Sequence, residues 1–91
     1  MVTIEQARQT VAAWLTTSRD GITRGLDGRD SENSLYWEIG FDIVSDDPFE
    51  HLVGQALALV DKNTGKLRLV PQPHQAKNAP DVDWESFRSV A

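Results

Sequence analysis

The chain contains no cysteine among its 91 residues. A disulfide framework, a thiolate nucleophile and a zinc site built on cysteine are therefore excluded. No stretch approaches the roughly 20 consecutive apolar residues that span a bilayer, and the first residues lack the basic and apolar segments of a signal peptide. We therefore expect a soluble, cytoplasmic protein without a membrane partner.

Basic side chains are also scarce. Nine lysines and arginines stand against fourteen acidic residues, which gives a net charge of −5. Residues 35–50 carry five carboxylates and no base. Because duplex DNA and RNA binding relies on Lys and Arg that neutralise phosphates, this distribution argues against a nucleic-acid partner. A basic protein is the better candidate.

The length and the composition are those of one small globular domain. Apolar residues make up 40% of the chain and charged residues 25%, which are ordinary globular proportions. Ninety-one residues are too few for two domains, and the chain has no internal repeat or low-complexity linker. We expect a single α+β domain over residues 1–91, of undetermined oligomeric state.

The N-terminal residues predict a helix over 3–17. Thr3 and Gln6 fit a capping box, in which each side chain satisfies a free backbone N–H of the first turn. Apolar residues then recur at helical spacing and form one stripe that can cover a sheet. These residues are Ile4, Ala7, Val11, Trp14 and Leu15.

An unbroken alternation predicts a strand over 35–43. The odd positions from Leu35 to Ile43 are large and apolar, whereas the even positions are mostly polar. A period of two means that one face of the strand is buried and the other is hydrated. The two-layer architecture and the candidate docking surface described below both depend on this strand.

The remaining elements complete a two-layer α+β domain. Further strands are expected at 55–61 and 66–70, joined by a hairpin in which Gly65 takes a positive φ, and a fourth strand at 21–26 is left open. The predicted antiparallel sheet of three to four strands is covered by the N-terminal helix. A short C-terminal helix at 83–89, capped by Asp83, would present Trp84 and Phe87 to the core or, as the less favoured alternative, to a partner.

The hydrated face of the strand at 35–43 is the candidate docking surface. Tyrosine is favoured at interface hot spots, carboxylates steer a basic partner, and a mid-strand glycine lets another backbone approach closely. An ordinary hydrated sheet face, or one partly covered by the loop at 18–34, is the interpretation that the sequence favours over docking. The candidate partner-binding residues are Tyr36, Glu38, Gly40, Asp42, Asp46, Asp47 and Glu50.

Catalysis and metal binding form the competing class of function. The two histidines, His51 and His74, lie outside any nucleophile motif. Asp46, Asp47, Glu50 and His51 cluster and could contribute to a metal site, but a capped turn whose acids suit the helix dipole is the favoured interpretation. We therefore expect no catalytic residue, no metal and no cofactor. A small enzyme or metal-binding domain that uses His51 with Asp47 and Glu50 is the alternative, and a housekeeping domain of unassigned partner is a third.

Four features occur together along the chain. They are an alanine-containing N-terminal helix, an aromatic strand at 36–41 (YWEIGF), an acidic connection into 52–54 (LVG), and a hairpin at 60–66 (VDKNTGK). In this combination, the stretch from residue 35 to residue 73 resembles the YrhB-like immunity proteins (immunity protein family 35) of bacterial polymorphic toxin systems.

The resemblance has two departures. In that family, a Gly-Asn-x-Pro run precedes the hairpin and a small Gly-Thr element follows it. Here residues 54–57 (GQAL) and 71–73 (PQP) stand in those places. The resemblance implies a small cytoplasmic protein without catalytic residues that neutralises a cognate toxin by binding it.

Overall fold

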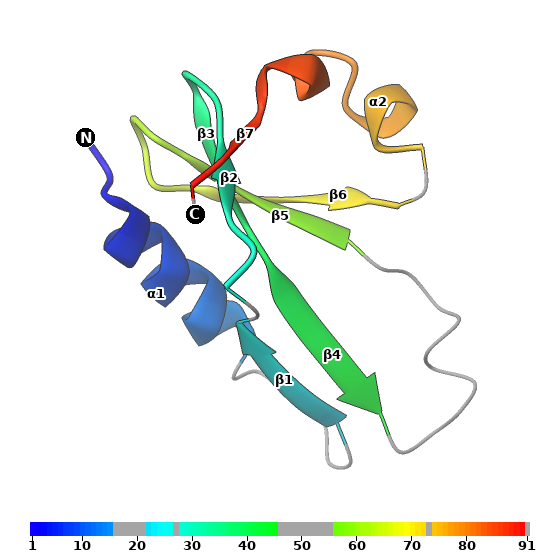
Figure 1. The fold of residues 1–91 in the computed structure, drawn as a ribbon. Coiled ribbons are helices and arrows are strands. Elements are labelled where there is room, and N and C mark those ends of the chain that lie inside the picture. The colour runs from blue at the N-terminus through cyan, green and yellow to red at the C-terminus, as the bar shows by residue number, and fades with distance from the viewer. Residues whose placement is uncertain (16–21, 27, 46–55, 73, 91) are drawn as a thin grey trace.

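The computed structural model describes residues 1–15, 22–26, 28–45, 56–72 and 74–90, with the backbone alone for 22–25 and 42–45. It confirms an α+β fold in which an N-terminal helix lies on an antiparallel sheet (Figure 1). No helix in these ranges is long and apolar enough to cross a membrane. The elements are α1 (Ile4–Leu15), β1 (Ile22–Leu26), β2 (Ser31–Glu32), β3 (Tyr36–Ile39), β4 (Phe41–Ser45), β5 (Ala56–Asp61), β6 (Leu67–Pro71), α2 (Gln75–Asn78), the 3-10 turn η2 (Trp84–Ser86) and β7 (Arg88–Ser89).

The strands form two antiparallel sheets. The larger sheet has five strands in the order β6-β5-β3-β2-β7, and the smaller pairs β1 with β4. Strands β5 and β6 confirm the predictions for 55–61 and 66–70, except that residue 55 lies outside the described residues and β6 is shifted by one residue. Strand β1 confirms the open candidate at 21–26, apart from residue 21, which is not described.

The predicted strand at 35–43 is confirmed as strand from residue 36, but it is not continuous, because the chain breaks at Gly40 into β3 and β4. The two registers explain the break: Leu26 pairs with Phe41, whereas Ser31 pairs with Glu38. On one side of the ladder four residues, 27–30, separate these two pairs, whereas on the other side only two residues, Ile39 and Gly40, separate them. Such a mismatch interrupts the ladder and bends the strands, as in a bulge.

Helix α1 covers one face of the five-stranded sheet. Its capping box is confirmed, since the Thr3 N–H donates to Gln6 Oε1 (2.9 Å) and the Gln6 N–H donates to Thr3 Oγ1 (3.2 Å). The described helix begins at residue 4 and ends at residue 15, and residues 16–17 of the predicted helix are not described. Six buried residues form the first core: Ala7, Val11, Leu15, Ile39, Ala58 and Val60.

The odd positions of the broken strand mostly face this core. Trp37 and Phe41 pack against it, and Trp37 Nε1 donates to the Val2 carbonyl at 2.9 Å. Leu35 is an exception, with 54% of its surface exposed, because it belongs to the turn before β3 rather than to the strand. The side chain of Ile43 lies outside the described residues.

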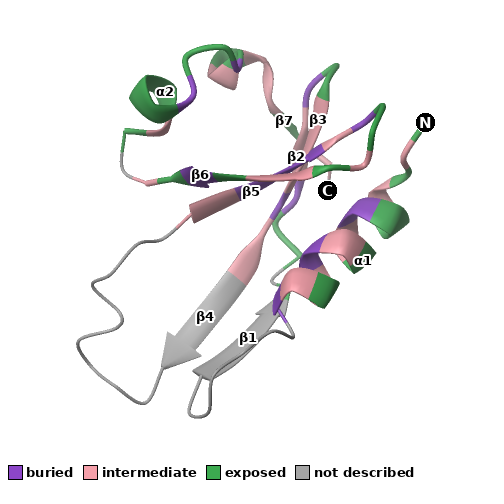
Figure 2. Cartoon of the chain, turned by 180° about the vertical axis from the view of Figure 1, so that it is seen from behind, coloured by how far each residue is buried: buried purple, intermediate pink, exposed green. Residues whose placement is uncertain are grey.

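The C-terminal segment covers the opposite face of the sheet (Figure 2). Leu59 and Val70 are buried there against Ala79 and Val82, and Tyr36 and Leu57 pack at the margin together with two aromatic residues, Trp84 and Phe87. The face predicted to be hydrated is therefore partly covered.

The predicted short C-terminal helix at 83–89 is confirmed only as a 3-10 helix over Trp84–Ser86. The segment forms the three-residue turn η2 and then β7, and Asp83 makes no side-chain cap. Phe87 is extended, and the next two residues pair with β2, which supplies a tertiary partner that local propensity cannot report. Trp84 and Phe87 nevertheless pack against the core, as favoured, with their ring centroids 5.6 Å apart, and Trp84 Nε1 donates to the Ala79 carbonyl.

Candidate functional site

The structure brings together two of the predicted docking residues. Tyr36 and Glu38 lie on the same face of β3, because residues two apart in a strand share a face. Gly40 marks the break, and Asp42 follows it in β4, in the other sheet, where only the backbone is described. The other three predicted residues, Asp46, Asp47 and Glu50, lie outside the described residues.

Tyr36 belongs to a hydrogen-bonded network that crosses the sheet. Its hydroxyl accepts a hydrogen bond from Arg68 Nη1 at 3.3 Å, and the same guanidinium donates two bonds to Asp81, at 2.7 and 2.8 Å. These bonds lower the pKa of Asp81 to about 2 and raise the pKa of Arg68. The network joins β3, β6 and the segment before η2, so it holds the Tyr36 ring in one orientation.

Among the residues that the structure describes, Glu38 forms no ion pair. Burial raises the pKa of its carboxyl. A side-chain hydrogen bond with Ser31, the residue directly opposite Glu38 on β2, lowers this pKa by a smaller amount. The ion pairs formed by the described residues, Arg8–Asp30, Lys62–Glu32 and Arg68–Asp81, do not include Glu38. A partly desolvated carboxylate in this position is suited to accept a cationic group.

Asp30 is a buried site that the sequence did not reveal. Its side chain is 2% exposed and accepts a hydrogen bond from Arg8 Nε at 2.7 Å. Its other oxygen accepts the Gly40 N–H at 3.1 Å, and its carbonyl accepts the Val90 N–H at 3.0 Å. Asp30 thus supplies Gly40 with a partner at the break between β3 and β4.

Two further buried polar residues support β3. Asn33 Oδ1 accepts the N–H groups of Leu35 and Tyr36, at 2.9 and 2.8 Å, and so forms the turn before the strand. Lys62 is 8% exposed, and its ammonium lies 3.1 Å from Glu32 Oε1 and 4.2 Å from the centroid of the Trp37 ring. Asp30, Asn33 and Lys62 have no local sequence signal beyond their polarity, because they lie in segments that the sequence indicates as loops.

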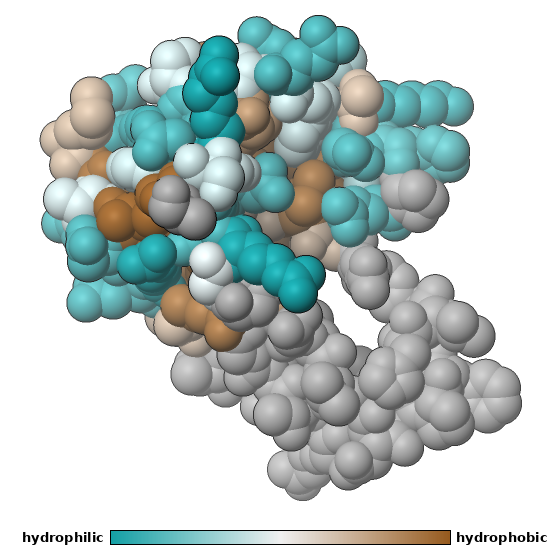
Figure 3. All heavy atoms as spheres, viewed as in Figure 1, coloured by the Kyte–Doolittle hydropathy of each residue, from teal (hydrophilic) through white to brown (hydrophobic). Residues whose placement is uncertain are grey.

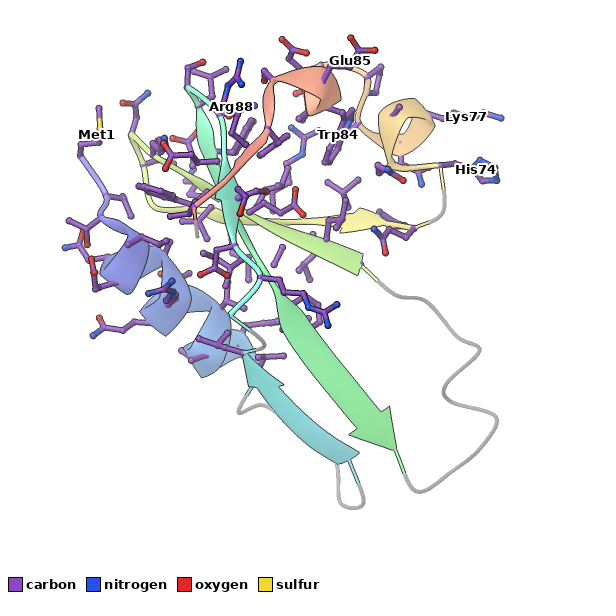
Figure 4. The ribbon with its side chains drawn as sticks, in the orientation of Figure 1. Met1, His74, Lys77, Trp84, Glu85 and Arg88 are labelled. Atoms are coloured by element: carbon purple, nitrogen blue, oxygen red, sulfur yellow. The ribbon has the colours of Figure 1, made fainter. Side chains whose placement is uncertain are left out.

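The structure leaves the metal-binding alternative without support from the residues it describes. Within them, no group of three or more His, Cys, Asp and Glu side chains could hold a metal ion. His74 is exposed before α2 and points away from the sheet (Figure 4). His51, with Asp47 and Glu50, lies outside the described residues, so that alternative stays a prediction.

Comparisons of the chain with protein-family models, with curated proteins and with solved structures gave no match. The resemblance to the immunity proteins therefore stays a prediction. The candidate site is defined by its own geometry: a half-buried carboxyl on β3, with a tyrosine fixed beside it on the same face.

Proposed function

We propose that this protein is a non-catalytic binding module that neutralises a cognate toxin by direct contact, as immunity proteins do. The observation that carries the proposal is the Glu38 carboxyl, which is half-buried on the same face of β3 as Tyr36 and forms no ion pair with the described residues. A lysine or arginine from a partner would supply the missing charge. The proposed partner is accordingly a basic protein in the cytoplasm.

The surroundings of Glu38 support the same partner chemistry. Tyr36 offers an immobilised aromatic side chain, which costs little further entropy on binding. The net charge of −5 favours encounter with a basic protein and opposes a phosphate backbone. Figure 3 shows a described surface that is mostly hydrophilic, with apolar residues in small patches. The proposed docking surface comprises Tyr36, Glu38, Gly40, Asp42, Asp46, Asp47 and Glu50.

The experiment first searches the neighbouring reading frames for a large secreted toxin, whose absence would count against the proposal, and then uses that toxin as the ligand. Its affinity for the full chain is measured by calorimetry at about 0.15 M salt, where long-range steering is screened. The double variant Glu38→Lys and Asp42→Lys is expected to weaken binding at least about tenfold, because it replaces attraction by like-charge repulsion at the contact. Circular dichroism checks that the variant remains folded.

The matched control changes the net charge equally at other places. Glu5 and Glu85 are both exposed, one on α1 and one on η2. The variant Glu5→Lys and Glu85→Lys should bind within about twofold of the wild type. Unchanged affinity in the Glu38 and Asp42 variant would remove this surface, and equal losses in both variants would show that only the total charge matters.

A further inference from the structure

The C-terminal segment, residues 74–90, covers one face of the five-stranded sheet and follows β6 through a single short connection. Figure 1 shows the chain turning back after β6, so that α2 and η2 lie beside the sheet. Part of the segment is held together by its own contacts, since Trp84 Nε1 donates to the Ala79 carbonyl and the centroids of the Trp84 and Phe87 rings lie 5.6 Å apart. The segment can therefore move as one unit.

The connection from β6 to this segment contains a local conflict. Pro71 and Pro73 flank Gln72 in the sequence, and a residue that precedes a proline favours extended backbone. His74, by contrast, takes the left-handed conformation, with φ 74° and ψ 34°. Among the residues that the structure describes, it is the only one other than glycine with a positive φ. This conformation is unfavourable for a residue with a Cβ, so the reversal of the chain at His74 is strained.

The contacts that hold the segment on the sheet lie away from this connection. The Arg68 guanidinium donates two bonds to Asp81, at 2.7 and 2.8 Å. Strand β7 pairs with β2, and the Val90 N–H donates to the Asp30 carbonyl at 3.0 Å. None of these contacts requires that its two sides belong to the same chain, so each can form in the same way between two copies.

Straightening the connection has one cost and one gain. The cost is the hydrogen bond from Asn78 Nδ2 to the Pro71 carbonyl, which spans the connection at 3.1 Å. Because this bond is exposed, water replaces most of what is lost. The gain is the release of His74 from its left-handed conformation. Since all the contacts on the sheet are kept, protein concentration decides between the closed chain and the exchanged pair.

We infer that two copies of this chain exchange their C-terminal segments, with His74 as the hinge, and so form a symmetric dimer. In this dimer, the segment of each copy covers the Leu59 and Val70 face of the other. A second copy is the occupant that fits, because this face already packs against Ala79 and Val82 of the same segment. Such domain swapping is a low-cost route to a dimer, and a short strained hinge favours it. The inference does not require the proposed function.

The contact between Arg68 and Asp81 can report which chain supplies the segment. Both side chains are partly exposed, 37% and 61%, so substitutions here should leave the fold intact. Two full-length variants, Arg68→Asp and Asp81→Arg, each place like charges at this contact. A swapped heterodimer of the two restores opposite charges at both contacts, once as in the wild type and once with the charges exchanged.

The two variants are mixed, unfolded in urea and refolded together at millimolar concentration. Native mass spectrometry should find at least about fivefold more heterodimer than either homodimer, because both contacts change from repulsive to attractive. The matched control mixes the wild type with a chain that carries both substitutions. A swapped heterodimer of that mixture has like charges at both contacts, so it should be depleted below random pairing.

The hinge is tested by two substitutions at His74. His74→Gly removes the penalty of the positive φ and should lower the dimer association constant at least about tenfold, because every dimer releases two such residues. His74→Val increases that penalty and should raise the constant. Size-exclusion chromatography with light scattering measures the dimer fraction, and circular dichroism checks that each variant is folded.

Three results would overturn the inference. The first is a wild-type chain that remains monomeric after refolding at millimolar concentration. The second is random pairing in both mixtures, which would show that a dimer forms through another surface. The third is an equal dimer association constant for the wild type and His74→Gly, which would show that His74 is not the hinge.

Discussion

Replacing Asp30 by alanine should destabilise the fold more than most single substitutions. The side chain is 2% exposed and accepts hydrogen bonds from Arg8 Nε and from the Gly40 N–H. Hydrogen bonds to a charged group contribute about 1.5–3 kcal/mol each, and a buried N–H left without a partner costs about 1–3 kcal/mol. Arg8, 41% exposed at its side chain, can turn to water. We therefore expect a loss of about 3 kcal/mol.

This loss is large for a chain of this size. At about 0.05–0.15 kcal/mol per residue, the free energy of unfolding of a small domain is only about 5–14 kcal/mol. A loss of about 3 kcal/mol would lower Tm by roughly 12 °C or more. Urea unfolding followed by tryptophan fluorescence measures it, and an unchanged m value shows that the denatured state is not altered.

Two controls identify the source of the loss. Asp30→Asn keeps an acceptor for Gly40 but loses the charge that faces Arg8, so its cost should be intermediate. A double-mutant cycle of Arg8→Ala with Asp30→Ala should give a coupling of at least about 1 kcal/mol. A cost below about 1 kcal/mol for Asp30→Ala, or strict additivity in the cycle, would refute the role assigned to this carboxylate.

Two ionisable groups and one glycine give further predictions. The pKa of Asp81 is lowered to about 2, so its ionised carboxyl stabilises the fold above pH 4, and this contribution is lost as the pH falls from about 4 to about 2. In the Asp81→Asn variant, the midpoint of urea unfolding should therefore depend less on pH over that range than in the wild type. Burial raises the pKa of Glu38, so its ionisation begins to oppose folding as the pH rises above the unfolded pKa and opposes it fully above the folded pKa. Glu38→Gln should therefore stabilise the chain at pH 7 and not at pH 4, and the reverse order would contradict the desolvation of Glu38. Gly65→Ala should cost about 1 kcal/mol because φ is 74° and the new Cβ would lie 3.4 Å from Val2 Cγ2. Gly28→Ala, with φ 78° and nothing within 4 Å, is its matched control, and equal costs in thermal melts would show that the Val2 contact adds nothing.

The elements that were predicted correctly are those with signals inside one segment. The capping box of Thr3 and Gln6 and the apolar stripe of α1 need only neighbours within four residues. The hairpin before β6 is equally local, since Gly65 takes the expected positive φ and its N–H donates to the Asp61 carbonyl at 2.9 Å. Local chemistry was therefore sufficient for α1, β5 and β6.

The break at Gly40 could not be predicted in this way. Alternation reports which residues are buried, and it continues through the break because Ile39 and Phe41 both face apolar neighbours. What ends the strand is the excess of residues on the opposite arm, together with Asp30, which lies ten residues away. The C-terminal strand β7 likewise depends on pairing with β2, more than fifty residues earlier.

The sequence predicted which residues of β3 form the candidate site, but it did not predict the surroundings of these residues. The sequence marked Tyr36 and Glu38 as residues of one strand face, and the structure keeps them on one face. It could not indicate that Arg68 and Asp81 would immobilise the tyrosine, because these partners lie on β6 and in the C-terminal segment. Nor could it indicate the burial of Glu38, which depends on how the sheet is covered.

Both ends of the described chain are tied to its middle, and this has a consequence during synthesis. The Val2 N–H bonds to the Lys62 carbonyl, and the Val90 N–H bonds to the Asp30 carbonyl. A growing chain on the ribosome can form α1 early, but the first tie must wait for residue 62 and the second for residue 90. The native arrangement is therefore completed only after residue 90 has left the exit tunnel, and until then the nascent chain exposes apolar surface that the folded domain buries.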